Sequence, residues 1–293
     1  SDERKRGKLM CWGGGPSPMI AATSEVLNYS VEDGYACGIL PTSHKLDCWG
    51  APRSWNEFHI SNRQSPKGVP ARAVTLGIAA ACYAKAEGGV ACWGILDSGR
   101  LEPPKDLTDG RKFRRFALGG RAICGVTVEN EALCWGWPTE MTGWQDLLPA
   151  GDIGNVVFDE MGAHICWSQL SDNQVVCHST SNESQEVVRY QAQSTVVELV
   201  SGGGVIGCAI EESGRATCFD RSSQTLIGED IVDMVVGWGV FCRLHKSGRV
   251  DCDANVGGAK PEMVKYNPGN TLPSGIRFRS IEGSGLTVCG VRE

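Results

Sequence analysis

The sequence lacks the features that would place the chain in a membrane or on nucleic acid. No apolar run in its 293 residues approaches the roughly 20 needed to span a bilayer, so we expect no membrane insertion. Lys and Arg number 28 against 34 Asp and Glu, a formal net charge of -6. The chain therefore has no excess of the cations that neutralise phosphates, which argues against nucleic-acid binding. The stretch Ser1–Lys8 shows no signal-peptide pattern, so any leader is expected to have been removed or to lie upstream.

Catalytic and metal-binding patterns are missing as well. No two Cys have the C-x2-C to C-x4-C spacing of paired zinc thiolates or of a redox site. No nucleophile elbow, His-Glu-x-x-His or Walker-type loop occurs. The five His are isolated in the sequence: His44, His59, His164, His178 and His245. Close carboxylates, such as Glu211 with Glu212 and Asp230 with Asp233, are interpreted as solvated positions. We predict a non-enzymatic protein with no cofactor and no metal; an active site assembled at a ring axis is the alternative.

Fourteen Cys are present instead, an even and high number that indicates disulfides and an oxidising compartment. Twelve of them form six close pairs with nine or ten intervening residues: Cys37 and Cys48, Cys82 and Cys92, Cys124 and Cys134, Cys166 and Cys177, Cys208 and Cys218, and Cys242 and Cys252. From Cys37 to Cys289 there are six steps over 252 residues, a mean period of 42. A period of this length is typical of propeller blades.

Each close pair is expected to join the two strands of a β-hairpin. Between Cys208 and Cys218 the residues Glu212–Gly214 form the turn, and a three-residue hairpin loop needs positive φ at its last position, usually Gly. Gly88 and Gly248 stand at the same position, and Asn130 replaces Gly in a fourth pair. Residues two positions from each Cys on its strand are apolar except Ser168, which is the alternation of a strand with one buried face.

Cys11 and Cys289 remain, one near each end of the chain. They are expected to pair in a seventh hairpin whose turn is replaced by the termini, so that the first strand of the chain completes the last blade. Residues 1–293 would then form a single domain, a closed ring with all fourteen Cys in disulfides. No free thiol would be left for chemistry.

Trp-Gly follows the second Cys of a pair four times, at Trp12, Trp49, Trp93 and Trp135. The wider unit, LGGRAICGVTVENEALCWG, resembles the regulator of chromosome condensation (RCC1-type) repeat. It is most similar to the extracellular, disulfide-bearing variants in bacterial secreted proteins and plant crinkly-type receptor kinases. The resemblance implies an all-β, seven-bladed β-propeller that serves as a docking surface. Later blades depart from the motif, with His178, Phe219 and Asp253 in place of Trp. The nuclear role of the namesake is disfavoured, because a reducing compartment would not keep seven disulfides.

Binding residues are sought in the variable connections between repeats. Trp55, Phe58 and His59 lie in the long segment after Gly50, and aromatic residues are favoured in interfaces. Covering a blade edge is the alternative for these three. Arg114 and Arg115 belong to the strongest basic cluster, which either grips an acidic partner or forms the solvated face of a strand. Two further candidates, Trp137 and Trp144, flank another loop.

Two N-glycosylation sequons begin at Asn28 and Asn182. Together with the disulfides they favour a secreted glycoprotein. We predict a secreted or cell-surface module that docks a protein partner through propeller loops. A carbohydrate-binding lectin and a structural subunit of an extracellular assembly are the alternatives.

Overall fold

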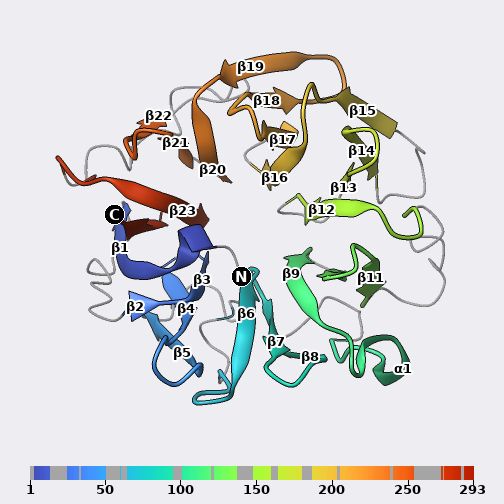
Figure 1. The fold of residues 1–293 in the computed structure, drawn as a ribbon, viewed down its shortest axis with the longest axis vertical. Coiled ribbons are helices and arrows are strands. Elements are labelled where there is room, and N and C mark those ends of the chain that lie inside the picture. The colour runs from blue at the N-terminus through green and yellow to red at the C-terminus, as the bar shows by residue number, and fades with distance from the viewer. Residues whose placement is uncertain are drawn as a thin grey trace.

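Seven small antiparallel sheets stand radially around a common axis in the computed structural model (Figure 1). The structure describes residues 3–13, 25–32, 34–50, 60, 65–94, 101–119, 122–136, 148–159, 164–179, 187–202, 205–237, 240–253, 272, 274–284 and 287–293. The predicted all-β, seven-bladed propeller is confirmed. That residues 1–293 form one domain stays a prediction.

The strands of each blade follow one another from the axis outward. Blades 1 to 3 are β3 (Asn28–Glu32), β4 (Tyr35–Ile39) and β5 (Leu46–Gly50); β6 (Ala71–Leu76), β7 (Ala80–Lys85) and β8 (Val90–Gly94); and β9 (Phe113–Leu118), β10 (Ile123–Thr127) and β11 (Ala132–Trp135). Blades 4 and 5 are β12 (Ile153–Phe158), β13 (His164–Gln169), β14 (Gln174–Ser179) and β15 (Val187–Gln191), and β16 (Val196–Gly202), β17 (Val205–Glu211), β18 (Ala216–Phe219) and β19 (Gln224–Gly228). Blade 6 is β20 (Ile231–Gly237), β21 (Val240–His245) and β22 (Val250–Asp253).

Blade 7 closes the ring with strands from both ends of the chain. Its order is β23 (Phe278–Ser284), β24 (Thr287–Arg292), β1 (Gly7–Gly13) and β2 (Glu25–Val26). Cys11 pairs with Cys289 in the β1–β24 register, and a disulfide joins them. The predicted closure by the two terminal strands is confirmed. A short 3-10 turn, η1 (Glu3–Lys5), precedes β1, and one short helix, α1 (Lys105–Thr108), follows blade 2.

Every predicted hairpin disulfide is present, and the seven Cα–Cα distances are 3.9 to 4.1 Å. The turn residues have the predicted conformation, with φ of 94° at Gly214, 80° at Gly248 and 66° at Asn130. Only glycine and a few polar residues adopt this left-handed region at low cost. Cysteine spacing and turn chemistry therefore specify the same hairpin register.

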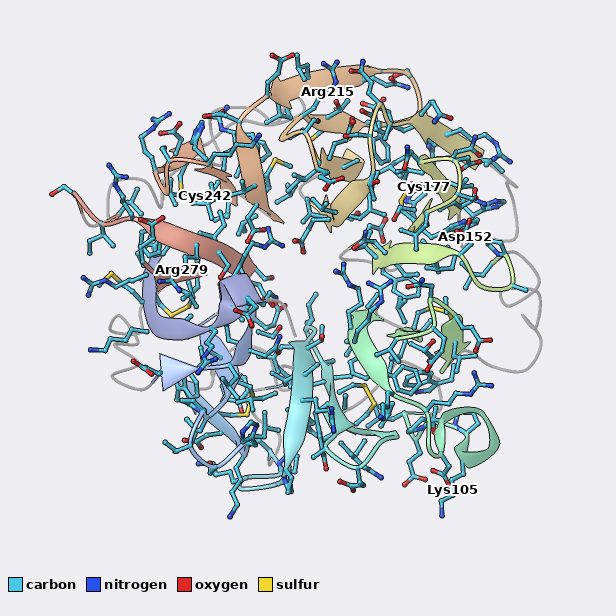
Figure 2. All side chains as sticks on the ribbon, in the orientation of Figure 1. Lys105, Asp152, Cys177, Arg215, Cys242 and Arg279 are labelled. Carbon is cyan, nitrogen blue, oxygen red and sulfur yellow. A yellow bond between two sulfur atoms is a disulfide. The ribbon has the colours of Figure 1, made fainter. Side chains whose placement is uncertain are left out.

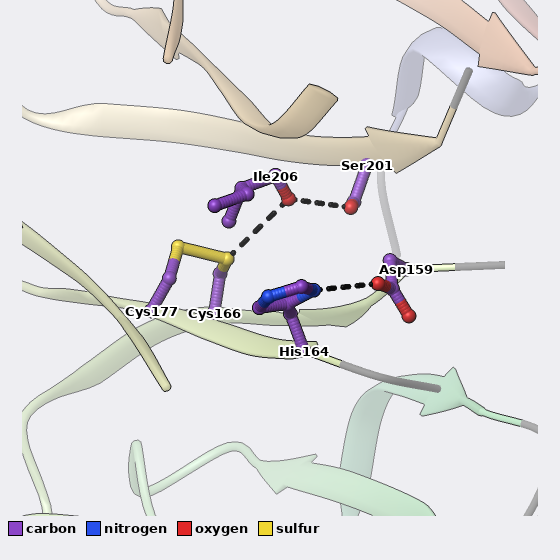
Figure 3. Close-up of a disulfide and its surroundings, with 6 residues drawn as sticks. All are labelled: Asp159, His164, Cys166, Cys177, Ser201 and Ile206. Atoms are coloured by element: carbon purple, nitrogen blue, oxygen red, sulfur yellow. Dashed lines mark hydrogen bonds and ion pairs between the residues drawn. A yellow bond between two sulfur atoms is a disulfide. The ribbon is translucent and has the colours of Figure 1, made fainter. Parts of the chain in front are cut away.

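The core lies between neighbouring blades. Cys208 and Ile210 of blade 5 pack in one buried cluster with Ile231, Met234 and Phe241 of blade 6. The disulfides belong to these junctions: the sulfur of Cys166 in blade 4 lies 3.6 Å from the carbonyl oxygen of Ile206 in blade 5 (Figure 3). The two-residue alternation of each strand thus buries one face against the next blade.

The Trp-Gly pairs are structural. Trp12, Trp93 and Trp135 are buried, and the ring of Trp12 lies 4.9 Å from that of Phe278. Gly94 has φ of 108°, and a Cβ there would collide with the carbonyl oxygen of Ala79. In this motif the Trp therefore fills the core with a large apolar ring, and the Gly lets two backbone segments pack closely together.

Two carboxylates predicted to be solvated are buried instead, and that interpretation was wrong. Glu211 is 1% exposed and Asp233 is 4% exposed. Glu211 accepts hydrogen bonds from the hydroxyl of Tyr190 at 2.8 Å and from the backbone N–H of Ser194 at 2.8 Å. These donors offset the cost of taking the carboxylate out of water. Among the described residues, no helix has the length and apolar character needed to cross a membrane.

Candidate functional site: the central channel

The innermost strands of all seven blades line a central cavity of about 810 Å³. Side chains from these strands project toward the axis (Figure 2). Glu3, Lys5 and Arg6 of the N-terminal segment also line it. We call this cavity the channel. It opens on the face that carries the turns between second and third strands, since His44, Ala86 and Val128 at the turns of blades 1 to 3 are part of its wall. We call this side the hairpin face.

A β-bulge recurs near the start of six innermost strands, where one extra residue opposes the second strand. The residues that follow the bulge form a ring around the axis, with Asn28 in the same register in blade 1: Asn28, Ala73, Arg115, Asn155, Glu198, Asp233 and Ser280. Bulges re-aim side chains and are frequent at functional positions. We call these seven residues the bulge ring.

Polar members of the bulge ring link blade 1 to blade 2, blade 4 to blade 5, and blade 6 to blade 7. The Asn28 side-chain oxygen accepts a hydrogen bond from the backbone N–H of Val74 at 3.1 Å. Asp233 accepts one in the same way from Ile281, at 2.9 Å. Asn155 donates to a backbone carbonyl of blade 5 at 3.1 Å. The ring therefore has a structural role, and five of its members also line the channel: Asn28, Ala73, Arg115, Glu198 and Asp233.

One half of the channel is acidic, and the N-terminal segment occupies it. The Arg4 guanidinium lies 3.0 Å from a carboxylate oxygen of Glu198, and it also donates to the carbonyl of Val232 at 2.6 Å. The Lys5 ammonium lies 2.6 Å from a carboxylate oxygen of Glu282. Arg4 and Lys5 thus neutralise charge on blades 5 to 7.

Burial and charge shift the protonation equilibria in this acidic half. Burial, and then the neighbouring Glu198, raise the pKa of Asp233 well above its usual range. Burial alone would lower the pKa of Lys5, but Glu282 and Glu198 outweigh it, so that pKa is raised. The ammonium is therefore held in its charged form by its carboxylate partners.

The opposite half of the channel is cationic. Arg114 of β9 donates to the carbonyls of Thr127, Ile153 and Gly154 at 3.2, 2.9 and 2.7 Å, and to the side-chain oxygen of Asn130 at 3.2 Å. Burial and the adjacent Arg115 lower the pKa of Arg114 to about 10, so it stays charged at neutral pH. Arg114 thus fastens blade 3 to blade 4.

The other cations of this half have few partners. Arg115 donates to the side-chain oxygen of Asn155, and Arg72 donates to the carbonyl of Ala86 at 2.7 Å. Within the part of the chain that the structure describes, no carboxylate forms an ion pair with Arg72, Lys112, Arg114 or Arg115. We call these four residues the basic cluster.

The structure places few of the binding residues predicted from sequence. Trp55, Phe58, His59, Trp137 and Trp144 lie outside the described residues, as does the sequon residue Asn182. Arg114 and Arg115 lie together on the channel wall. The sequon residue Asn28 lines the channel as a member of the bulge ring. Glycosylation at Asn28 and Asn182 stays a prediction.

Sequence reasoning missed the acidic half altogether. Glu198 and Asp233 each sit between apolar residues in a four-residue pattern, Val196–Leu199 and Ile231–Met234. The same pattern occurs in Ile153–Val156, with Asn155 at the polar position. The recurrence of this pattern once per repeat was the feature of the sequence that could have identified these channel residues.

Histidines isolated in the sequence have carboxylate neighbours in space. The ring nitrogens of His245 lie 2.8 Å from Asp230 and 2.7 Å from Asp251. The ring of His164 lies 2.8 Å from Asp159, beside the Cys166 disulfide (Figure 3). Over the described ranges, no group of three His, Cys, Asp or Glu side chains is arranged to hold a metal ion.

Comparison with known proteins agrees on the fold. No family model matches the chain. The CRINKLY WD40 ectodomain of the Arabidopsis thaliana receptor kinase ACR4 is 18% identical, with a TM-score of 0.62 over 90% of each chain. Human WBSCR16 is 11% identical, with a TM-score of 0.67 over 98% of this chain and 99% of that one. Yeast RCC1 (Prp20), solved with Kap60 bound, is 11% identical, with a TM-score of 0.67 over 98% and 90%.

The fold is that of the RCC1-like β-propellers. At these identities the likeness concerns the fold alone, and function is argued from the site. The expected resemblance to a disulfide-bearing, RCC1-like propeller is confirmed by these structures together with the seven disulfides.

Proposed function

We propose that this protein is an extracellular, non-enzymatic RCC1-like propeller that binds a protein partner at the hairpin-face mouth of its channel. The observation that carries the proposal is the wall of the channel, where a basic cluster with no carboxylate partner among the described residues lies beside apolar side chains. Open concave surfaces with a few converging polar groups are the usual binding sites of folded proteins.

The extracellular placement rests on chemistry. All fourteen Cys are paired, and disulfides persist in oxidising compartments. The likeness to a plant receptor ectodomain supports the same placement. Yeast RCC1, a protein with this fold, was solved with the protein Kap60 bound to it. It supports the class of partner and does not identify the partner.

Affinity capture from the native extracellular fluid, followed by chemical cross-linking and mass spectrometry, tests the proposal. We expect one protein to co-purify in a saturable manner and its cross-links to map to the hairpin face. A glycan array is run in parallel with the same protein. Strong and selective sugar binding, with no captured protein, would establish the lectin alternative and overturn the proposal.

A further inference from the structure

We propose that the basic cluster binds the carboxylate side chains of an acidic peptide segment that the partner presents at the hairpin face. This inference rests on the proposed function and specifies the chemistry of the partner. The cluster comprises Arg72 of blade 2, and Lys112, Arg114 and Arg115 at the start of blade 3. All four residues line the same channel.

Within the described part of the chain, the charge of these four residues has no carboxylate counterion. The acidic half of the channel has Arg4 and Lys5 as counterions, but none of the four basic residues pairs with a described carboxylate. Glu3, which also lines the channel, makes no ion pair with them. Arg114 and Arg115 are adjacent and partly buried, whereas Arg72 and Lys112 are exposed. Like charges at close range repel one another, and a bound anion relieves that repulsion.

Arg115 is the member best placed to bind a ligand. The Arg114 guanidinium donates hydrogen bonds to four acceptors of the protein. Arg115 makes a single described side-chain hydrogen bond, to the neutral amide of Asn155. A guanidinium carries five N–H donors in a planar fork. The remaining donors suit the two oxygens of a carboxylate, which Arg binds in bidentate fashion.

The channel wall favours a peptide over a polyanionic glycan. Two apolar side chains with accessible surface, Val128 at 50% exposure and the partly buried Val157, line the cavity beside the cations. A ligand with apolar groups between its charges therefore fits better than an evenly charged one. The channel also already holds a peptide, because Glu3–Arg6 of this chain lie along the acidic half. A basic segment in the acidic half implies, by charge complementarity, an acidic segment in the basic half.

Fluorescence anisotropy with a labelled hexapeptide of alternating Glu and Leu tests this inference, and the same peptide with Gln in place of Glu is the control ligand. We expect the Glu peptide to bind at least tenfold more tightly than the Gln peptide and to weaken as salt is added. Arg115→Gln should weaken the Glu peptide about tenfold, while Arg115→Lys should recover part of the loss. Lys105→Gln, in helix α1 at the outer edge of the molecule (Figure 2), should leave binding unchanged.

Equal binding of the Glu and Gln peptides, or undiminished binding by a folded Arg115→Gln protein, overturns the inference. A sulfated oligosaccharide that binds more tightly than the Glu peptide, in an Arg115-dependent manner, also overturns it. The melting temperature of each variant establishes that it is folded. If Arg115→Gln still captures the native protein partner at full yield, this inference fails while the proposed function stands. If the acidic peptide binds but no protein partner is captured, this inference stands while the proposed function fails.

Discussion

The ammonium nitrogen of Lys5 lies 2.6 Å from Oε2 of Glu282, which joins residues 277 positions apart at the wall of one channel. The same two ends of the chain are linked covalently by Cys11 and Cys289 in the same blade. The start of the chain therefore completes the last blade and also supplies the counterions of the acidic half. The same N-terminal residues therefore close the ring and balance charge in the channel.

Replacing Lys5 by Met should destabilise the fold, because Glu282 would lose its ion-pair partner and Glu198 would lose a nearby cation. We expect the free energy of unfolding to fall by about 1–3 kcal/mol, the usual loss for a partly buried, charge-assisted hydrogen bond. Lys8→Met is the matched control, since Lys8 lies in the adjoining strand with an exposed side chain. Urea denaturation of both variants measures the difference, and equal stability would contradict this account.

Loss of the closing disulfide should matter more than loss of a hairpin disulfide. Cys11 and Cys289 are 278 residues apart, whereas Cys208 and Cys218 are 10 apart. In the chain-entropy model the long link contributes roughly 5 kcal/mol and a short one roughly 3 kcal/mol. Cys11→Ala should therefore lower the melting temperature by more than Cys208→Ala does. Equal shifts in calorimetry would argue against closure by the terminal link.

Asp233 should make stability fall as pH rises. Its folded-state pKa is raised, so the folded protein keeps a proton that the unfolded chain releases above about pH 4. Stability is then fully present below pH 4 and is lost as pH rises toward the folded-state pKa. Asp233→Asn should flatten this decline in unfolding free energies measured from pH 4 to pH 8. An unchanged slope would mean that Asp233 is ionised throughout this range.

Asp230, three residues before Asp233, has a pKa shift of the opposite sign. The hydrogen bond from His245 lowers the pKa of Asp230 in the folded protein. Its contribution is present above about pH 4 and is lost as pH falls through the folded-state pKa. Asp230→Asn should therefore reduce acid sensitivity and leave the decline between pH 4 and pH 8 in place. The same series of unfolding measurements, extended below pH 4, separates the two carboxylates.

Arg114 and Arg115 are adjacent in sequence but should differ in what their loss costs. Arg114→Ala removes two hydrogen bonds that fasten blade 3 to blade 4 and one within blade 3, and it should lower the free energy of unfolding by about 2–4 kcal/mol. Arg115→Ala removes one described hydrogen bond and should lower it by about 1 kcal/mol. Guanidinium denaturation of the pair tests the assignment. Similar losses would show that both residues are structural.

Much of the fold was accessible from spacing and residue type. The pairs of Cys nine or ten residues apart specify hairpin strands with a period of 42, and Cys11 with Cys289 specifies closure. Gly214 and Asn130 identify the turns because few residues tolerate positive φ. These are local relationships, decided by the geometry of one hairpin, so a single sequence reveals them.

The channel could not be obtained in this way. The residue after each bulge is one position per repeat, and its neighbours in space come from other blades. Alternation of apolar and polar residues indicates which side of a strand is buried. It does not show whether a polar residue faces bulk solvent or the channel at the axis of the ring. Asp233 was therefore interpreted as solvated, and Arg114 was left open between a partner site and a solvated strand face.

Composition and spacing alone thus determine the number of blades, the disulfide register and the closing strand, since each follows from chain geometry within a hairpin or from pairing of the two ends. Convergence of seven innermost strands decides the rest. It buries Asp233, brings Lys5 to Glu282, and places Arg115 beside Arg114 with no carboxylate partner among the described residues. Charges from separate blades interact only when the ring is closed, because Coulomb energy depends on distance in space and not on separation along the chain.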